Sequence, residues 1–287
     1  MAIRDVHRFI NEADETTIQN LITRMETRGK DPAFAQLRDA YLDKLPLTPA
    51  VHVLDLGCGT GVVARAVARR AGFAGRSTGV DQNPLLIETA RRLAAEEGLG
   101  DRMEFQVGDA HALEYAAESF DIVIAHTLIS HVTDPLAVLR ESARVVRRGG
   151  IVIIFDGDYG SLTFACADPE LGKAMDEALK TAVFTNPRVM SNLPRLLREV
   201  GLELAGTLPH AHAEIGTGSY FKSFAETYAP LVSRIGLLPE EQVERWLTDQ
   251  HRAIKEGTFF AACNYYAYLA VRPTRFSEKE KEGNWGN

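Results

Sequence analysis

The chain has 287 residues, of which 45% are hydrophobic and 25% are charged, as in an ordinary soluble enzyme built from one domain with additions. A formal net charge of −7 offers no general attraction to nucleic acid or to an anionic membrane, so neither is expected as a partner. No apolar run approaches the roughly 20 residues of a membrane helix, and the first residues lack the apolar core of a secretion signal. Three widely spaced cysteines argue against a disulfide framework, so we expect a cytoplasmic protein and leave a homodimer open.

Two helices are predicted at the start of the chain. Apolar side chains recur at helical spacing from about Glu12 to Gly29, where a glycine and a proline interrupt the pattern. A second helical pattern runs from Phe34 to about Pro46. We therefore expect residues 1–48 to form a helical cap in front of the first strand.

A strand followed by a glycine-rich turn is the most informative stretch. Val51 to Leu56 is a short apolar run that predicts a buried strand, and glycines follow at alternate positions up to Gly61. A helical segment comes next, and a backbone with this geometry can approach a nucleotide-like ligand closely and present N–H groups to it. The G-x-G-x-x-G loop of dinucleotide-binding proteins would place its third glycine where this chain has Val62.

The acidic residue inside this motif indicates the charge of the ligand. The carboxylate of Asp55 would repel a pyrophosphate and attract a ligand that carries an amino group or a sulfonium. Together with the displaced third glycine, Asp55 makes the loop more suitable for S-adenosylmethionine than for NAD.

Strands and helices alternate after the glycine turn, which is typical of an α/β fold with a doubly wound sheet. A polar loop is expected at residues 156–160, after the fifth strand. The predicted strands after the first are Ser77 to Val80, Met103 to Val107, Phe120 to Ala125, Ile151 to Phe155, Leu202 to Leu208 and Phe259 to Val271. The predicted helices are Leu85 to Glu97, Asp134 to Arg148, Pro169 to Val183, Ser191 to Val200 and two more between Ser219 and Glu256.

A second acidic residue ends the second predicted strand. Asp81 lies at the carboxyl end of that strand, where open α/β sheets bind ligands. A carboxylate there can accept hydrogen bonds from both hydroxyls of a ribose. The alternative is an N-cap for the helix that begins near Pro84. The glycine loop before it favours ribose binding.

The stretch from Val53 to Gly61 resembles the first motif of the class I S-adenosylmethionine-dependent methyltransferases. More narrowly, it resembles the ubiquinone/menaquinone-biosynthesis-type group that acts on small molecules. The resemblance extends from Val51 to about Phe155, and more loosely to Pro273. It implies a Rossmann-like, doubly wound sheet of seven strands, the last antiparallel, with helical caps. It also implies methyl transfer to an oxygen, nitrogen or carbon of a small molecule, with S-adenosylhomocysteine as the product.

The resemblance also suggests how the chain is divided. A methyltransferase domain is expected at residues 49–273, with an inserted helical cap at about 217–257 that covers the substrate. In similar proteins a helical pair like that of residues 1–48 contributes a lid over the cofactor, and simple packing on the sheet is the alternative. The charged segment 274–287 is expected to be disordered.

The resemblance implies a set of cofactor contacts. The position of Asp109 lies near the adenine in this family, where a carboxylate can accept from the exocyclic amine, while the neighbouring N–H can donate to the ring. A turn residue is the alternative for Asp109, and Cys58 is explained as a small apolar filler. The residues expected at the cofactor are Asp55, Gly57, Cys58, Gly59, Gly61, Asp81, Gln82, Asp109, Ala110 and His126.

Methyl transfer is an in-line displacement, so the protein must align the nucleophile, exclude water and, where needed, remove a proton. Candidate side chains follow the fourth and fifth strands: His126, His131, Asp158 and Tyr159. An imidazole with an ordinary pKa of about 6.5 suits a general base, although each histidine could instead be a capping or core residue. His126 is the first choice for contact with the acceptor, with Tyr159 and Asp158 as further candidates.

Three other interpretations compete with this one. Asp156 and Asp158 could hold Mg²⁺ as in catechol-type methyltransferases, but those have a further aspartate where this chain has His126, so no metal is expected. An NAD(P)-dependent Rossmann oxidoreductase would share the strand–turn–helix, but Val62 and Asp55 argue against it. A non-catalytic S-adenosylmethionine-binding protein would keep the cofactor loop. The sequence does not reveal the acceptor, because the cap residues that would select it carry no motif.

Overall fold

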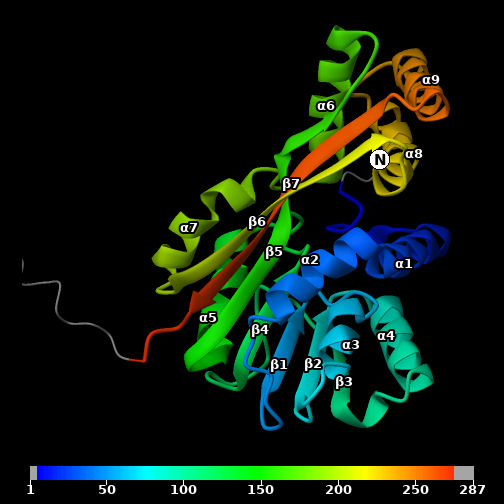
Figure 1. The fold of residues 1–287 in the computed structure, drawn as a ribbon. Coiled ribbons are helices and arrows are strands. Elements are labelled where there is room, and N and C mark those ends of the chain that lie inside the picture. The colour runs from blue at the N-terminus through cyan, green and yellow to red at the C-terminus, as the bar shows by residue number, and fades with distance from the viewer. Residues whose placement is uncertain (1–4, 275–287) are drawn as a thin grey trace, which may run out of the picture.

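The computed structural model describes residues 5–274, and its centre is a seven-stranded sheet in the order β3-β2-β1-β4-β5-β7-β6 (Figure 1). The first five strands pair in parallel, and β7 is antiparallel to both β5 and β6. This arrangement confirms the predicted doubly wound sheet with an antiparallel last strand. The strands are β1 (His52–Leu56), β2 (Arg76–Asp81), β3 (Met103–Val107), β4 (Phe120–His126), β5 (Val146–Phe164), β6 (Glu203–Gly216) and β7 (Phe259–Val271).

Helices cover both faces of the sheet because consecutive strand residues point to opposite sides. In β1, Val53 packs in one apolar cluster with α2 and α3, whereas its neighbour Leu54 packs in another with α5 and α7. The α-helices are α1 (Glu15–Lys30), α2 (Pro32–Leu42), α3 (Val62–Ala68), α4 (Pro84–Glu96), α5 (Pro135–Val145), α6 (Pro169–Val183), α7 (Val189–Glu199), α8 (Tyr220–Arg234) and α9 (Glu240–Glu256). Short 3-10 turns occur at Ile10–Glu12 and Gly100–Arg102.

The fifth and sixth strands are much longer than predicted. The expected polar loop at residues 156–160 is wrong, because this segment continues β5, where Asp156 pairs with Tyr266 and Gly157 with Tyr265 of β7. The helix expected to reach Arg148 ends at Val145, and β5 begins directly after it. Likewise, β6 continues to Gly216 instead of ending at Leu208.

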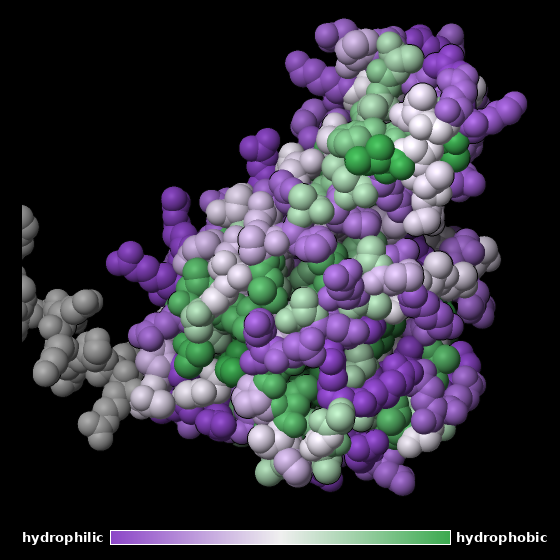
Figure 2. Space-filling view, viewed as in Figure 1, coloured by the Kyte–Doolittle hydropathy of each residue, from purple (hydrophilic) through white to green (hydrophobic). Residues whose placement is uncertain are grey.

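These extensions carry a second part of the molecule, which we call the upper lobe. It consists of the outer halves of β5, β6 and β7 together with α6, α8 and α9 (Figure 1). The helices α8 and α9 occupy the predicted insertion between Ser219 and Glu256. Figure 2 shows apolar side chains on the surface of this lobe, where Ile215 of β6 is 73% exposed opposite Phe260 of β7.

The first helix is fastened over the glycine loop by buried charges. Nη2 of Arg65 on α3 lies 2.8 Å from Oε2 of Glu26 on α1, and the Arg65 side chain is only 4% exposed. The hydroxyl of Thr60, inside the loop, donates to Oε1 of Glu26 at 2.6 Å. The guanidinium of Arg65 is also paired with Glu97, so α1, the loop and α4 meet at this arginine.

Two remaining expectations concern the ends of the chain and membranes. The predicted tail at 274–287 lies outside the described residues apart from Thr274. Within residues 5–274, none of the helices combines the length and apolarity that crossing a bilayer requires.

Replacing Glu26 with alanine should lower the free energy of unfolding by about 1–3 kcal/mol, because a buried guanidinium would lose one of its acceptors. Glu96→Ala is the matched control: Glu96 pairs with Arg92 at 2.7 Å, but both side chains are more than half exposed. Pairs of that kind contribute only about 0.3–0.5 kcal/mol. Urea denaturation followed by circular dichroism measures both, and equal losses would contradict the buried tether.

Candidate active site

The turn between β1 and α3 has a backbone that only glycine adopts easily. Gly57, Gly59 and Gly61 have φ angles of 63°, 53° and 79°, in the left-handed region where other residues are strained. The N–H of Gly59 donates to Oδ2 of Asp81 at 2.9 Å, so the turn is joined to the end of β2. A Cβ built on Gly59 would lie 2.9 Å from Sδ of Met25, which places α1 directly above the turn.

Two carboxyl groups border this turn without an ion-pair partner among the described residues. Asp55 is 1% exposed, and its Oδ2 accepts from the N–H of Ala64 at 3.0 Å. Burial raises the pKa of Asp55 to about 7. Burial also raises the pKa of Asp81, although N–H groups of Asn83 and Gly59 hydrogen-bond to its carboxylate. A positively charged ligand or a pair of hydroxyl donors would stabilise the ionised forms of both groups.

The alternative role of Asp81 as a helix cap is wrong. Asn83 caps α4, since its Oδ1 accepts from the N–H groups of Leu85 and Leu86 at 3.0 and 3.1 Å. Asp81 instead accepts from the N–H of Asn83 and from the glycine turn. The carboxylate of Asp81 therefore remains beside the cavity described next.

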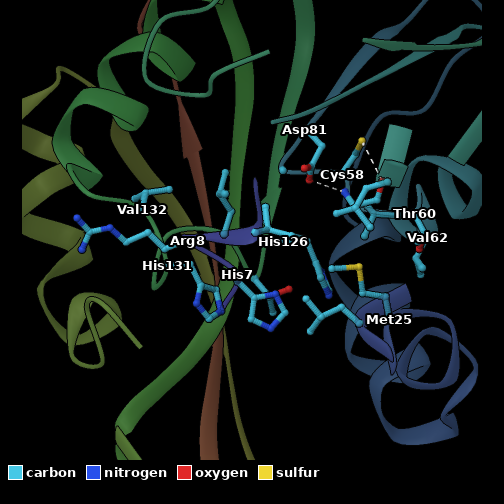
Figure 3. Close-up of a pocket in the computed structure, with 18 of the residues that line it drawn as sticks. His7, Arg8, Met25, Cys58, Thr60, Val62, Asp81, His126, His131 and Val132 are labelled. Carbon is cyan, nitrogen blue, oxygen red and sulfur yellow. Dashed lines mark hydrogen bonds between the residues drawn. The ribbon is translucent and has the colours of Figure 1, made fainter. Parts of the chain in front are cut away.

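A cavity of about 240 Å³ lies between the glycine turn, α1, the end of β4 and Tyr159 of β5. Figure 3 shows Asp81 and Cys58 on one side of it and the rings of His7 and His131 on the other. Gly61 does not line the cavity. Its left-handed backbone lies at the N-cap position, directly before α3. The residues of the predicted cofactor set that do line it are Asp55, Gly57, Cys58, Gly59, Asp81, Gln82, Asp109, Ala110 and His126.

The adenine end of the predicted set is the most exposed. The Asp109 side chain is 64% exposed, and its Oδ1 lies 2.6 Å from Nδ1 of His111 and accepts from the N–H of the same residue. Asp109 thus forms a local turn contact while it lines the cavity. Gln82 donates to the carbonyls of His7 and Arg8, both at 3.3 Å, so the segment before α1 crosses this edge of the cavity.

His126 is a half-buried imidazole that is held in its neutral form. Its Nδ1 lies 2.8 Å from the hydroxyl of Tyr41 on α2, and its ring stacks on Phe155 with centroids 4.5 Å apart. Burial lowers the pKa of His126 well below its usual value, and the charges of Arg28 and Arg38 add to this effect. An imidazole that resists protonation is a poor acceptor for a proton from a substrate.

A second histidine in the cavity has the features of a general base. Nδ1 of His131 lies 2.8 Å from Oδ1 of Asp5, a carboxylate that is only 2% exposed. The other oxygen of Asp5 accepts from the N–H and the hydroxyl of Thr185 at 2.8 and 2.6 Å. Burial lowers the pKa of His131, but the charge of Asp5, its hydrogen bond and the charge of Asp156 together outweigh burial, so the net pKa is raised. This dyad orients the ring and favours its protonated form.

The neighbouring His7 is arranged differently. Its ring centroid is 4.6 Å from that of His131, and its Nε2 lies 3.0 Å from the hydroxyl of Tyr228 on α8. Burial and the adjacent His131 lower the pKa of His7 to about 3. His7 therefore stays neutral when His131 takes up a proton.

The two remaining predicted catalytic residues, Asp158 and Tyr159, are consecutive in β5, so their side chains point to opposite faces of the sheet. Tyr159 lines the cavity and stacks on Phe184 with centroids 3.5 Å apart, whereas Asp158 does not line it. Oδ1 of Asp158 is buried without a hydrogen-bond partner, and burial raises the pKa of this carboxyl. Across residues 5–274, no cluster of three or more His, Cys, Asp or Glu side chains could hold a metal ion.

Comparisons with known proteins agree on the family. A family model described as a methyltransferase domain matches residues 47–201, more than half of the chain. An uncharacterised 37.1 kDa protein in transposon TN4556 of Streptomyces fradiae is 28% identical over 93% of this chain and 76% of that protein. Methyltransferase GfsG of Streptomyces halstedii is 32% identical over 59% of each chain. A ubiquinone biosynthesis O-methyltransferase of Parvibaculum lavamentivorans is 38% identical over 36% of this chain and 39% of its own.

Solved structures share the fold at low identity. The cyclase SpnF superposes with a TM-score of 0.56 at 22% identity, over 85% of this chain and 82% of its own. A geranyl diphosphate methyltransferase solved with S-adenosylmethionine superposes with a TM-score of 0.52 at 17% identity, over 83% and 84% of the two chains. The chain thus covers less than two thirds of the two curated methyltransferases, but the family match includes the whole glycine turn. The chain therefore belongs to the methyltransferase-domain family and is a class I S-adenosylmethionine-dependent methyltransferase.

Proposed function

We propose that this enzyme methylates a hydroxyl oxygen of a small molecule and that His131 removes the hydroxyl proton. The observation that carries the proposal is the pair of His131 and the buried Asp5, in the same cavity as the glycine turn. A hydroxyl becomes a good nucleophile for a methyl group only as it loses its proton, and a buried carboxylate that orients a histidine makes that ring a base. A nitrogen acceptor with a free lone pair can attack the methyl group without first losing a proton, so it would not need such a pair.

The residues at the glycine turn fit S-adenosylmethionine. Glycines with positive φ leave space where side chains would stand, and the unpaired Asp55 and Asp81 suit a cationic ligand with a ribose. We assign Asp81 to the ribose hydroxyls, Asp55 to the charged methionine part, and the turn at Asp109 and Ala110 to the adenine. When bound, S-adenosylmethionine supplies an electrophilic methyl group on a positively charged sulfur.

The proton transfer follows from the orientation of His131. Asp5 occupies Nδ1, so Nε2 is the ring nitrogen available to the acceptor hydroxyl. As the oxygen–methyl bond forms and the sulfur–methyl bond breaks, the hydroxyl proton passes to Nε2. The positive charge lost from the sulfur reappears on the imidazolium, where the carboxylate of Asp5 stabilises it.

His126 and Tyr159 have a positioning role in this scheme. The neutral ring of His126 is held by Tyr41 and Phe155 at the end of β4, next to the glycine turn. Burial raises the pKa of Tyr159 well above its usual value, so its hydroxyl donates hydrogen bonds and does not act as a base. Both side chains can align the acceptor oxygen with the methyl group.

Asp81→Ala should weaken binding of S-adenosylhomocysteine at least ten-fold, because hydrogen bonds to a charged acceptor contribute roughly 1.5–3 kcal/mol each. Asn83→Ala is the matched control, since it removes the cap of α4 and leaves the carboxylate in place. This variant should lose about 1 kcal/mol of stability and keep its affinity. Isothermal titration calorimetry measures both, and similar affinities in the two variants would refute the ribose contact.

Gly59→Val should abolish binding of S-adenosylhomocysteine while the protein remains folded. A β-branched residue at a φ of 53° distorts the turn, and its side chain would enter the space between the turn and Met25. Gly72→Val is the control for backbone strain, because Gly72 has a φ of 82° and no atoms within 4 Å of a built Cβ. Thermal melts should show comparable losses of stability in the two variants. Calorimetry should show binding of S-adenosylhomocysteine only in Gly72→Val. Wild-type affinity in Gly59→Val would exclude this turn as the binding site.

His131→Gln should lower kcat by about 10²–10⁴-fold, the usual contribution of a general base. The acceptor for this assay is found by screening metabolite extracts with methyl-labelled S-adenosylmethionine. His251→Gln, which alters a half-exposed histidine on α9, should leave kcat unchanged. Full activity of His131→Gln would refute the proposed base.

The pH profile gives a second test of the same pair. In the wild type, kcat should rise with pH as His131 loses its proton, through a pKa that Asp5 has raised. Asp5→Asn removes that charge and leaves burial, so the pKa of His131 should fall and the rising limb should move to lower pH. The groups His7, Asp156 and Arg28 also face His131, and none of them is changed. An unmoved limb would show that another group titrates.

A further inference from the structure

Arg28, in the last turns of α1, is a cation with two nitrogens that find no hydrogen-bond partner among residues 5–274. Its Nε and Nη2 atoms are both enclosed by protein, and neither has an acceptor. These two N–H groups lie on one edge of the guanidinium, the edge that binds the two oxygens of a carboxylate side by side. A buried donor that makes no hydrogen bond costs more free energy when it belongs to a charged group than when it belongs to a neutral one.

Aromatic rings surround the same guanidinium. Its central carbon lies 4.4 Å from the ring centre of Phe34, 5.6 Å from that of Tyr220 and 6.0 Å from that of Tyr265. Ring faces attract a cation, but they do not satisfy N–H groups that point outward in its plane. The rings therefore hold Arg28 in place and leave its hydrogen-bonding edge for another group.

A second arginine stands one turn earlier on the same face of α1. Nη1 of Arg24 donates to the hydroxyls of Ser223 and Thr227 on α8, and its guanidinium lies 4.8 Å from the ring centre of Tyr228. Within the described residues, no carboxylate pairs with Arg24 or Arg28. The buried Arg65 is the contrast, because two glutamates neutralise it.

Both arginines lie between two cavities. They line the cavity that contains the glycine turn, and they also line a second cavity of about 750 Å³ between α1 and α8. The second cavity contains no residue of the glycine turn and neither Asp55 nor Asp81. Arg28 thus faces a space that extends away from the cofactor side, toward Tyr220 of the upper lobe.

We propose that the methyl acceptor carries a carboxylate and that Arg28 binds it, with the apolar part of the acceptor between the aromatic rings of α8 and α2. The inference rests on the proposed function, because it takes the first cavity as the site of methyl transfer. It adds a substrate class: a hydroxyl and a carboxylate joined by an apolar or aromatic framework. Arg24 strengthens the positive potential at the entrance and favours anions over neutral molecules of the same shape.

The test uses the full chain saturated with S-adenosylhomocysteine and two small probes of nearly the same shape, phenylacetate and phenylacetamide. Calorimetry should show the carboxylate binding about ten-fold more tightly than the amide, because only the carboxylate accepts two charge-assisted hydrogen bonds. Phenylacetate should bind together with S-adenosylhomocysteine. Competition between them would mean that Arg28 holds the carboxylate of the cofactor, and equal affinity for both probes would make Arg28 a purely structural cation; either result overturns the proposal.

Variants assign the preference to Arg28. Arg28→Gln should remove the preference for phenylacetate, and Arg28→Lys should keep a smaller one, because an ammonium is a point charge without the planar fork. Arg92→Gln is the control, since Arg92 lies in an exposed pair with Glu96 on α4 and should leave the preference unchanged. A full preference in Arg28→Gln would overturn the assignment. If either Arg28 variant fails to fold in a thermal melt, the wild-type probe pair still decides the carboxylate preference.

The first titration separates this inference from the proposed function. A wild-type protein that does not bind S-adenosylhomocysteine at all would remove the methyl-transfer site on which both depend. A protein that binds S-adenosylhomocysteine but shows no preference between the probes would retain the methyl-transfer site and lose only the carboxylate.

Discussion

The free-energy cost of burying an ionisable group without a partner determines how charged side chains are arranged at the carboxyl ends of the parallel strands. Parallel strands bring their carboxyl ends to one edge, and in this chain α1 and the upper lobe cover that edge and remove it from water. Each charged side chain enclosed there must be paired, neutralised or completed by a ligand. Some of these side chains have a partner inside the protein and others do not, and the second kind are the candidates for binding a ligand.

Arg65 and Asp5 illustrate groups with internal partners. Arg65 is paired with Glu26 and Glu97 and holds α1 over the glycine turn, while Asp5 is paired with His131 and Thr185. Asp55 and Asp81 have N–H donors but no cationic partner in the described part of the chain. The acidic pair lies at the glycine turn, whereas the unpaired arginines lie where the first cavity meets the second, so groups of opposite charge line different parts of the first cavity. A ligand pair with a sulfonium at one end and an anion at the other matches that polarity.

Local signals in the sequence predicted the first half of the sheet and the cofactor turn. The strand and alternate glycines up to Gly61 need only neighbouring residues to define them, and the last strand was predicted with its observed ends at Phe259 and Val271. The extension of β5 could not be found in this way. Residues 156–160 are polar and rich in glycine, and they become a strand only because β7, about a hundred residues later, supplies the other half of the ladder.

The proposed catalytic pair and the unpaired arginine could not be predicted from the sequence, for the same reason. His131 was one of several candidates, and nothing in its surroundings along the chain indicates Asp5, which is 126 residues away and reaches it through a left-handed backbone. Arg28 resembles any basic residue near a helix end until α8 and β7 place aromatic rings around it. Contacts between distant segments, rather than composition or periodicity, create both features.

The long antiparallel ladder has a mechanical consequence. β6 and β7 stay in continuous register from Gly206 to Gly216, and they run without a break from the sheet into the upper lobe. This pair of strands resists bending, since bending it would break several backbone hydrogen bonds at once. The upper lobe is therefore joined to the sheet by backbone hydrogen bonds, whereas α1 is joined to the glycine turn by the side-chain contacts of Glu26. The side chains proposed to bind the acceptor and to take its proton, Arg28 and His131, lie on α1 or contact Asp5 in the segment before it, so a displacement of this part of the chain would also disturb the proposed site.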